Sequence, residues 1–206
     1  KKVDDFSCLL SSRLPQLVQL LYSIQTNDLQ AIYNLFYFLQ GLKTMNAPVA
    51  LTPELLTQLT AIVGENRIKT DADSLENWGR DHTKHFDPNP SVIVFPSSTE
   101  QVQAIVKLAN QFNVAITPSG GRTGLSAGAV AANGEIVVSM DKMNQVLEFF
   151  PADRMVRVQA GVVTEQLQNY AEQQGMYYPV DFASAGSSQI GGNIGTNAGG
   201  IKVIKY

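Results

Sequence analysis

A strand–helix–strand pattern over residues 92–117 constrains the fold of this chain more than any other feature. VIVF at 92–95 and VAIT at 114–117 are short apolar runs that predict two buried strands, each followed by a proline. Between them, Ser98 and Gln101 form a capping box that starts a helix. Because such a helix joins strands by a right-handed crossover, we expect the two strands to be parallel.

The residues after this unit predict further strands and one more helix. EIVVSM at 135–140 is a short apolar run, and RMVRVQA at 154–160 alternates as a half-buried strand does. Thr164 can cap a helix that Gly175 ends. We expect a mixed arrangement of helices and strands in this part of the chain.

The segment before residue 92 divides into two parts. Thr52 is predicted to cap a helix that starts at Pro53 and ends near Gly64, and residues 65–91 are expected to be irregular. Residues 1–44 predict an N-terminal helical extension, an amphipathic hairpin, for which a peripheral membrane or partner contact is the alternative. Polar residues interrupt this extension, so it holds no apolar run of about 20 residues that could span a bilayer.

Composition and charge disfavour several classes of function. The 206 residues carry a formal net charge of −3, and no basic stripe appears, so a nucleic-acid partner is not expected. The single cysteine, Cys8, excludes an intramolecular disulfide. His82 and His85 have no second cluster of ligands, so we expect no metal site. The sequence lacks the layout of a secretory signal, which favours a cytoplasmic protein.

Two glycine-rich runs, PSGGRTGLSAG at 118–128 and GSSQIGGNIGTNAGG at 186–200, stand out from the rest of the chain. They are either two mobile connections or two halves of one anion-holding site. Glycines remove the Cβ atoms that would block a ligand, and successive N–H groups can then cradle a phosphate. The first run follows a predicted strand, at the end where open α/β sheets bind ligands. Neither run fits a Walker loop or a Rossmann turn.

The two runs, in this order and at this separation, carry a resemblance to a known family. Together with PSVIVFPSSTEQVQAIVKLANQFNVAITP and VRVQAGV, they resemble the FAD-binding domain of the vanillyl-alcohol-oxidase type. The branch that is most similar contains D-lactate dehydrogenase, D-2-hydroxyglutarate dehydrogenase and the flavin subunit of glycolate oxidase. The resemblance covers 88–206, and more loosely begins at 50.

The resemblance implies an α+β fold of two lobes that is incomplete at the C-terminus. The first lobe, about 50–134, is expected to be a small βαβ sheet with helices. The second, about 135–206, is expected to be a mainly antiparallel sheet with flanking helices. Residues 45–87 would form a helix and an irregular lead-in, 88–206 a partial FAD-binding domain, and a substrate domain would be absent.

The resemblance also implies which residues bind FAD. The first run would cradle the pyrophosphate, and the second would lie along the flavin and its ribityl–phosphate chain. Arg122 holds the position at which some relatives attach flavin through histidine, so the cofactor should be non-covalent; Arg122 itself is either near the pyrophosphate or a solvated loop charge. The expected cofactor-binding residues are Ser119, Gly120, Gly121, Arg122, Thr123, Gly124, Pro179, Gly186, Ser187, Ser188, Ile190, Gly191, Gly192, Asn193, Thr196 and Asn197.

The implied activity is oxidation of a 2-hydroxy acid of the D-lactate, glycolate or D-2-hydroxyglutarate type, by hydride transfer to flavin. The catalytic residues are unknown, because in this branch they lie mostly in a later substrate domain, and the electron acceptor is also unknown. Peripheral attachment to the inner membrane is a family alternative to a purely cytoplasmic location. The alternative function is a non-catalytic truncated flavin-binding or interaction protein.

Overall fold

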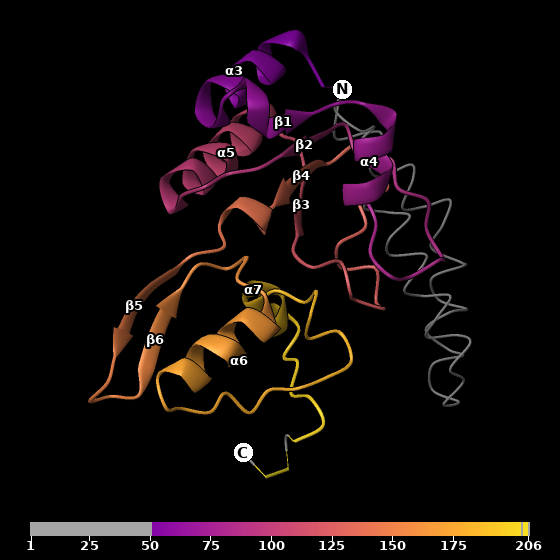
Figure 1. The fold of residues 1–206 in the computed structure, drawn as a ribbon. Helices are drawn as coiled ribbons and strands as arrows, with labels where there is room; N and C mark the ends of the chain where they lie inside the picture. The colour runs from indigo at the N-terminus through magenta and orange to yellow at the C-terminus, as the bar shows by residue number, and fades with distance from the viewer. Residues whose placement is uncertain (1–50, 203, 206) are drawn as a thin grey trace, which may run out of the picture. The chain divides into compact units, whose positions relative to one another are not determined.

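The computed structural model describes residues 51–202, 204 and 205 of the chain (Figure 1). The described part is α+β, as the sequence predicts, with two separate sheets. Its elements in chain order are α3 (Pro53–Val63), η1 (Glu65–Arg67), β1 (Ile68–Lys69), α4 (Ala72–Trp78), β2 (Val92–Val94), α5 (Thr99–Phe112), β3 (Ile116–Ser119), β4 (Ile136–Ser139), η2 (Met140–Lys142), β5 (Val146–Phe150), β6 (Met155–Val158), α6 (Thr164–Gln173) and α7 (Ile190–Gly195).

The first sheet has four strands in the order β1-β2-β4-β3. β2 and β3, the strands that flank α5, are both parallel to β4, which lies between them. The predicted parallel arrangement is therefore confirmed, although β2 and β3 are not direct neighbours. Because β4 belongs to this sheet, the chain passes to the second sheet between Ser139 and Val146.

Helices cover both faces of the first sheet (Figure 1). Val92 and Val94 of β2 pack with α3 and α5 on one face, and Ile93 packs with Leu75 and Trp78 of α4 on the other. The three β2 residues are fully buried. Burial on both faces explains why VIVF reads as a continuous apolar run and not as an alternating one.

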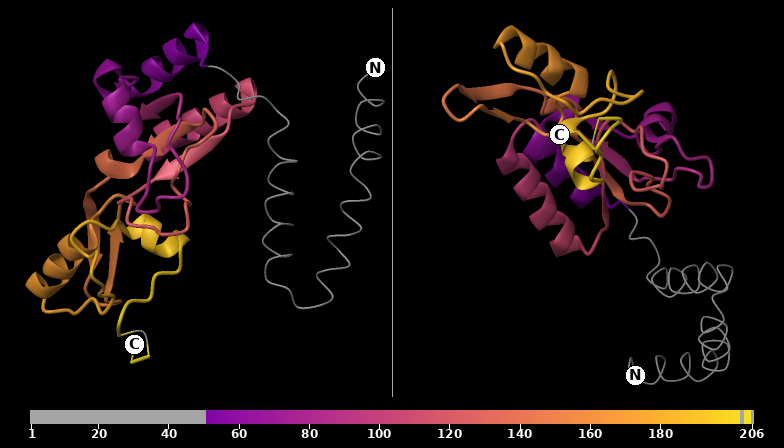
Figure 2. Two further views of the ribbon diagram at one scale, coloured as in Figure 1. Left: turned by 90° about the vertical axis from the view of Figure 1, so that its right-hand side faces the viewer. Right: turned by 90° about the horizontal axis from the view of Figure 1, so that it is seen from below.

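The second sheet is the antiparallel hairpin β5–β6, with α6 beside it (Figure 2). Val156 and Val158 of β6 pack toward Val162, Leu167 and Ile190, so a small core joins the hairpin to α6 and α7. Met155 and Arg157, which alternate with the two valines, are exposed. The predicted half-buried strand is thus confirmed.

The N-terminal capping predictions for α3 and α5 hold, with one difference in detail. The one for α6 is wrong, because Val163 is the N-cap and Thr164 is the first residue of the helix. The Thr52 hydroxyl accepts a hydrogen bond from Leu55 N at 3.1 Å, and α3 ends at Gly64. Ser98 Oγ accepts from Gln101 N at 3.3 Å, as expected. The Gln101 side chain, however, accepts from Ser97 N at 2.8 Å and donates to Ile62 O at 2.9 Å, so it also ties α5 to α3.

Two other predictions of local structure are wrong, and two elements were not predicted. α4 lies within the stretch expected to be irregular, and Asp71 caps it by accepting from Ser74 N at 2.9 Å. β3 continues through Pro118, which is tolerated because β3 is an edge strand. β5 has no counterpart among the predicted strands, and α7 forms inside the second glycine-rich run.

The expectations for residues 1–44, including Cys8 and a membrane or partner contact there, lie outside the described residues. Within the described part, no helix combines the length and the apolar character that crossing a membrane requires.

Two neighbouring residues of α5 provide a test of this packing. Ile105 is fully buried in the core against the first sheet, whereas Val106 is 42% exposed. Ile105→Ala should lower the free energy of unfolding by about 2–5 kcal/mol, because it leaves a cavity. Val106→Ala should change it by less than about 1 kcal/mol. Urea denaturation of both variants checks this, and equal losses would contradict the described orientation of α5.

Candidate functional site

The candidate site lies at the carboxyl ends of β3 and β4 in the first sheet. β3 and β4 are parallel and end in register, with Ser119 opposite Ser139. Gly120 follows the end of β3, and Asp141 follows the end of β4 within η2. The parallel strands therefore place the first glycine-rich run and the Asp141 carboxylate at the same end of the sheet. Ligand sites in open α/β sheets lie at this end.

The two glycine-rich runs meet backbone against backbone at Gly121. A Cβ on Gly121 would overlap the Ser187 carbonyl oxygen and lie 2.8 Å from Ser188 Cα. A Cβ on Gly120 would be 3.4 Å from Gln189 Oε1. The sequence interpretation of two halves of one site is supported, because any side chain at position 121 would force the runs apart.

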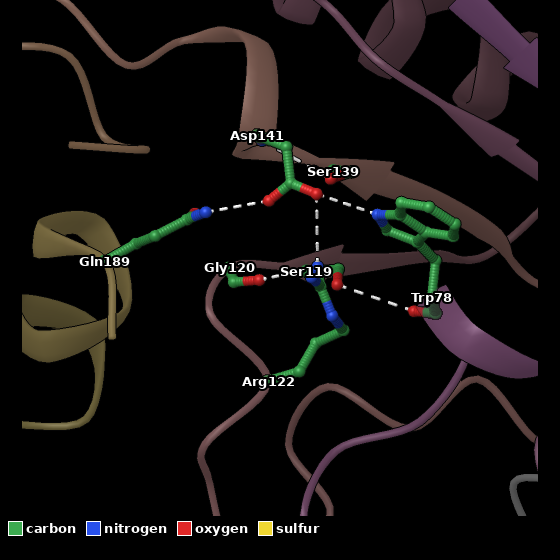
Figure 3. A network of polar contacts seen from close by, with 7 residues as sticks. All are labelled: Trp78, Ser119, Gly120, Arg122, Ser139, Asp141 and Gln189. Atoms are coloured by element: carbon green, nitrogen blue, oxygen red, sulfur yellow. Dashed lines mark hydrogen bonds and ion pairs between the residues drawn. The ribbon is translucent and has the colours of Figure 1, made fainter. Parts of the chain in front are cut away.

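The Asp141 carboxylate is bonded to residues of three other segments (Figure 3). Its Oδ1 accepts from Gln189 Nε2 at 2.7 Å. Its Oδ2 accepts from Trp78 Nε1 at 2.8 Å and lies 3.4 Å from Arg122 Nη1. These contacts connect both glycine-rich runs to α4 through a single side chain. The Asp141 side chain is 24% exposed, so solvent only partly screens its ion pair with Arg122.

Arg122 folds back on its own run. Its backbone has φ of 57°, and its Nη1 donates to Gly120 O at 2.9 Å as well as pairing with Asp141. The guanidinium also lies 5.6 Å from the centroid of the Trp78 ring, within the range of a cation–π contact. The side chain is 27% exposed and its charge is paired, so it is not a freely solvated loop charge.

The second run is anchored by a buried polar cluster at the start of α6. Thr164 Oγ1 lies 2.7 Å from Ser188 Oγ and accepts from Asn193 Nδ2 at 2.6 Å. Thr164 N also donates to Ser188 O at 2.9 Å. The three side chains are buried. Ser188 and Asn193, which are among the predicted cofactor-binding residues, thus help to fix the second run.

α7 presents one packed face and one open face. Ile190 is buried in the core with α6 and β6, and a Cβ on Gly191 would lie 2.7 Å from Ala160 Cβ. By contrast, no described atom outside its own helix lies within 4 Å of the place a Cβ would take on Gly192. Thr196 is exposed and donates to Gly192 O at 2.8 Å. The open face has the small residues that a close-packed ligand requires.

The backbone contact between the two runs at Gly121 and Ser187 is called the seam below. The remaining predicted residues lie at or beside it. Gly186 is exposed just before the contact with the first run, Ser187 is exposed and contributes its carbonyl to that contact, and Asn197 follows α7 with φ of 53°. Thr123 is half-buried, and Gly124 is exposed. Pro179 lies in a segment held against α6, where Gln168 Nε2 donates to Val180 O at 2.8 Å. The neighbouring Tyr178 is partly buried there, which raises the pKa of its phenol.

Three residues of the site were missed by sequence reasoning: Asp141, Gln189 and Asp81. Asp81 is buried beside the first run, where its Oδ1 accepts from Thr83 N at 2.8 Å and its Oδ2 has no hydrogen-bond partner among the described residues. The sequence around it drew attention to His82 and His85, which are exposed. No three potential metal ligands gather anywhere in the described part of the chain.

Comparison with known proteins places this geometry in a family. The family model described as "FAD binding domain" matches residues 90–206. In solved structures, the fold is similar to that of an alkyldihydroxyacetonephosphate synthase, at a TM-score of 0.71 and 24% identity over 79% of this chain and 32% of that one. It is also similar to the fold of p-cresol methylhydroxylase, at a TM-score of 0.54 and 21% identity over 63% of this chain and 27% of that one. The chain belongs to the FAD-binding domain family of FAD-linked oxidoreductases, and the predicted resemblance is confirmed.

Curated relatives make the match more specific. The chain is 68% identical over 154 residues to a D-2-hydroxyglutarate dehydrogenase of Stutzerimonas stutzeri and 53% identical over 156 residues to one of Xanthomonas citri pv. viticola. It is 37% identical over 157 residues to a D-lactate dehydrogenase of Anaerostipes hadrus. Each match covers about three quarters of this chain, and the chain spans about one third of the length of these relatives.

The residues of the site fit the cofactor of this family. Outside its own helix, no described atom fills the space beside Gly192 on α7, and the buried Gln189 Oε1 near Gly120 has no hydrogen-bond partner among the described residues. An extended cofactor that carries phosphates, hydroxyls and a flat ring needs glycine-lined walls and scattered polar groups of this kind.

The Thr164 hydroxyl should stabilise the conformation of the second run. Thr164→Val removes the hydroxyl that pairs with Ser188 and accepts from Asn193, so two buried polar groups lose a partner. We expect a loss of about 1–3 kcal/mol in the free energy of unfolding. Thr164→Ser keeps the hydroxyl and should lose less. Denaturation of the two variants side by side is the measurement, and equal stability of the valine and serine variants would refute this role.

Proposed function

We propose that this chain is the FAD-binding part of an FAD-dependent oxidoreductase that oxidises a D-2-hydroxy acid. The observation that carries the proposal is the 68% identity, over a stretch of 154 residues, to a protein named D-2-hydroxyglutarate dehydrogenase. A second relative named for D-lactate oxidation supports the wider class of substrates. The first candidate substrate is therefore D-2-hydroxyglutarate, and the second candidate is a smaller 2-hydroxy acid such as D-lactate.

The proposed cofactor-binding unit covers 88–206, and its binding residues come from the two runs. Backbone N–H groups and hydroxyls of residues 119–124 would hold the pyrophosphate, because glycines let the backbone approach the phosphate oxygens. Gly192, Thr196 and Asn197 on the exposed side of α7 would lie along the rest of FAD. Ser188 and Asn193 would act indirectly, since their side chains are bonded to Thr164.

The cofactor would be held without a covalent bond. Arg122 occupies the place of an attaching histidine, and its guanidinium is already engaged with Gly120 O and Asp141. When bound, FAD supplies an acceptor for the hydride that leaves the hydroxyl-bearing carbon of the substrate. The residues of this chain would bind and orient the cofactor, and we assign none of them as the base that takes the hydroxyl proton.

Substitution at Gly192 tests the cofactor site without disturbing the core. Gly192→Ala adds a methyl group where no described atom outside its own helix lies within 4 Å, and alanine favours a helix. The variant should therefore fold at least as stably. Its affinity for FAD, measured by quenching of flavin fluorescence, should fall about tenfold because the methyl group occupies the binding face.

Val106→Ala is the control, because it shortens one exposed side chain on α5 and lies outside both glycine-rich runs. Its affinity for FAD should equal that of the unaltered protein. A Gly192→Ala variant that binds FAD as tightly as the control would show that α7 does not form the binding face.

Anaerobic mixing with candidate substrates tests the activity. The full-length protein, loaded with FAD, should lose its oxidised flavin absorbance on addition of D-2-hydroxyglutarate, and more slowly or not at all with L-2-hydroxyglutarate. D-Lactate and glycolate complete the series. An FAD-loaded protein whose flavin none of these acids reduces would overturn the proposed activity and favour the non-catalytic alternative.

A further inference from the structure

The Asp141 carboxylate accepts hydrogen bonds from three residues that lie far from it in the sequence or on a glycine-rich run. The carboxylate follows β4, and its backbone N–H donates to Ser139 Oγ at 3.3 Å. An ionised carboxylate accepts hydrogen bonds and donates none. Gln189, Trp78 and Arg122 supply the three donors, and they come from the N-cap of α7, from α4 and from the first run. Figure 3 shows these side chains converging on the carboxylate from different segments.

The carboxylate fixes which way the Gln189 amide points. The Nε2 group must face Asp141 Oδ1, at 2.7 Å, because two acceptor oxygens placed face to face would repel each other. The amide oxygen then points away from Asp141, toward Gly120, where an added Cβ would lie 3.4 Å from it. This Oε1 is buried and has no hydrogen-bond partner in the described part of the chain.

A buried acceptor without a partner is costly, and in native proteins it usually has a reason. Gln189 is 6% exposed, so bulk water gives it little compensation. Its oxygen lies where the two glycine-rich runs meet, which is the proposed binding site. The missing partner is therefore expected to be a donor on a bound molecule, such as a hydroxyl or an N–H group.

We propose that Asp141 is a positioning residue for FAD binding, acting through Gln189 and Arg122. Its carboxylate turns the Gln189 carbonyl oxygen into the seam, where that oxygen accepts a hydrogen bond from a hydroxyl or N–H of the cofactor. The same carboxylate pairs with Arg122 and so holds the first run in its folded-back conformation. Asp141 itself does not contact FAD. This inference rests on the proposed function, because it concerns the same site.

The test is FAD affinity in the full-length protein after the cofactor has been removed, with Asp141→Asn as the first variant. Asparagine keeps the size of the side chain but loses the charge and one acceptor. Because hydrogen bonds to charged groups are among the stronger ones, we expect the dissociation constant for FAD to rise about 10- to 100-fold. Glu148→Gln is the matched control. It removes an exposed carboxylate paired with Arg157 in the β5–β6 hairpin, and FAD affinity should not change.

A double-mutant cycle separates positioning from a general effect on folding. Gln189→Met keeps the length of the side chain and removes both polar groups, and it should also weaken FAD binding about tenfold. If Asp141 acts through Gln189, adding Asp141→Asn to Gln189→Met should weaken binding by a smaller factor than Asp141→Asn does alone. Independent factors that multiply would overturn the proposal.

The outcomes also distinguish this inference from the proposed function. If the unaltered protein binds no FAD, the proposed function fails and this inference fails with it. If the unaltered protein binds FAD and Asp141→Asn binds it equally well, this inference alone is overturned. Should Asp141→Asn not fold, Gln189→Met decides the matter, because an unchanged affinity for FAD in that variant contradicts the assigned role of its oxygen.

Discussion

The close approach of two backbones at Gly121 and Ser187 is the constraint on which the rest of the site depends. No other residue type fits at position 121, because a Cβ would overlap the Ser187 carbonyl. The contact brings together runs that are about 70 residues apart in the sequence, and neither run contains enough apolar side chains to hold it by packing alone. The seam therefore has to be held from outside by hydrogen bonds and by the two sheets.

Each run has its own support. The first follows β3, whose parallel pairing with β4 places Gly120 and Asp141 at the same edge of the sheet. The second is fixed by Thr164 at the start of α6 and by Ile190, which is buried against β6 and α6. The Asp141 carboxylate then links the two supports through Arg122 and Gln189. Rigid elements thus position loops that carry the binding groups, as in many ligand sites.

Local patterns were sufficient to predict the elements that carry strong signals. Capping residues marked α3 and α5, and apolar runs marked β2 and β4. α4 also had a usable signal, since Asp71 precedes its first residue as a cap and Leu75 and Trp78 follow at helical spacing. α7 had none, because glycine is a poor helix former and the helix depends on Ile190 and on the bond from Asn193 to Thr164.

The two glycine-rich runs of the candidate site could be identified from the sequence, whereas the hydrogen bonds that hold them together could not. The glycine runs and their order gave the family, which the family match to residues 90–206 confirms. The role of Asp141 depends on partners 63 and 48 residues away in the sequence, and a lone acidic residue after a strand carries no local signal for such contacts. Likewise, the burial of Ser188 and Asn193 follows from tertiary packing around Thr164, which a polar run in a sequence does not reveal.

Hydrogen–deuterium exchange of the full-length protein, with and without FAD, tests the central claim most directly, because it reports on both runs at once. If the two runs form one cofactor site, peptides covering 119–124 and 186–197 should both become protected on addition of FAD. The exposed tip of the β5–β6 hairpin should not change. Protection of one run alone, or of neither when flavin absorbance shows that FAD is bound, would contradict a shared site.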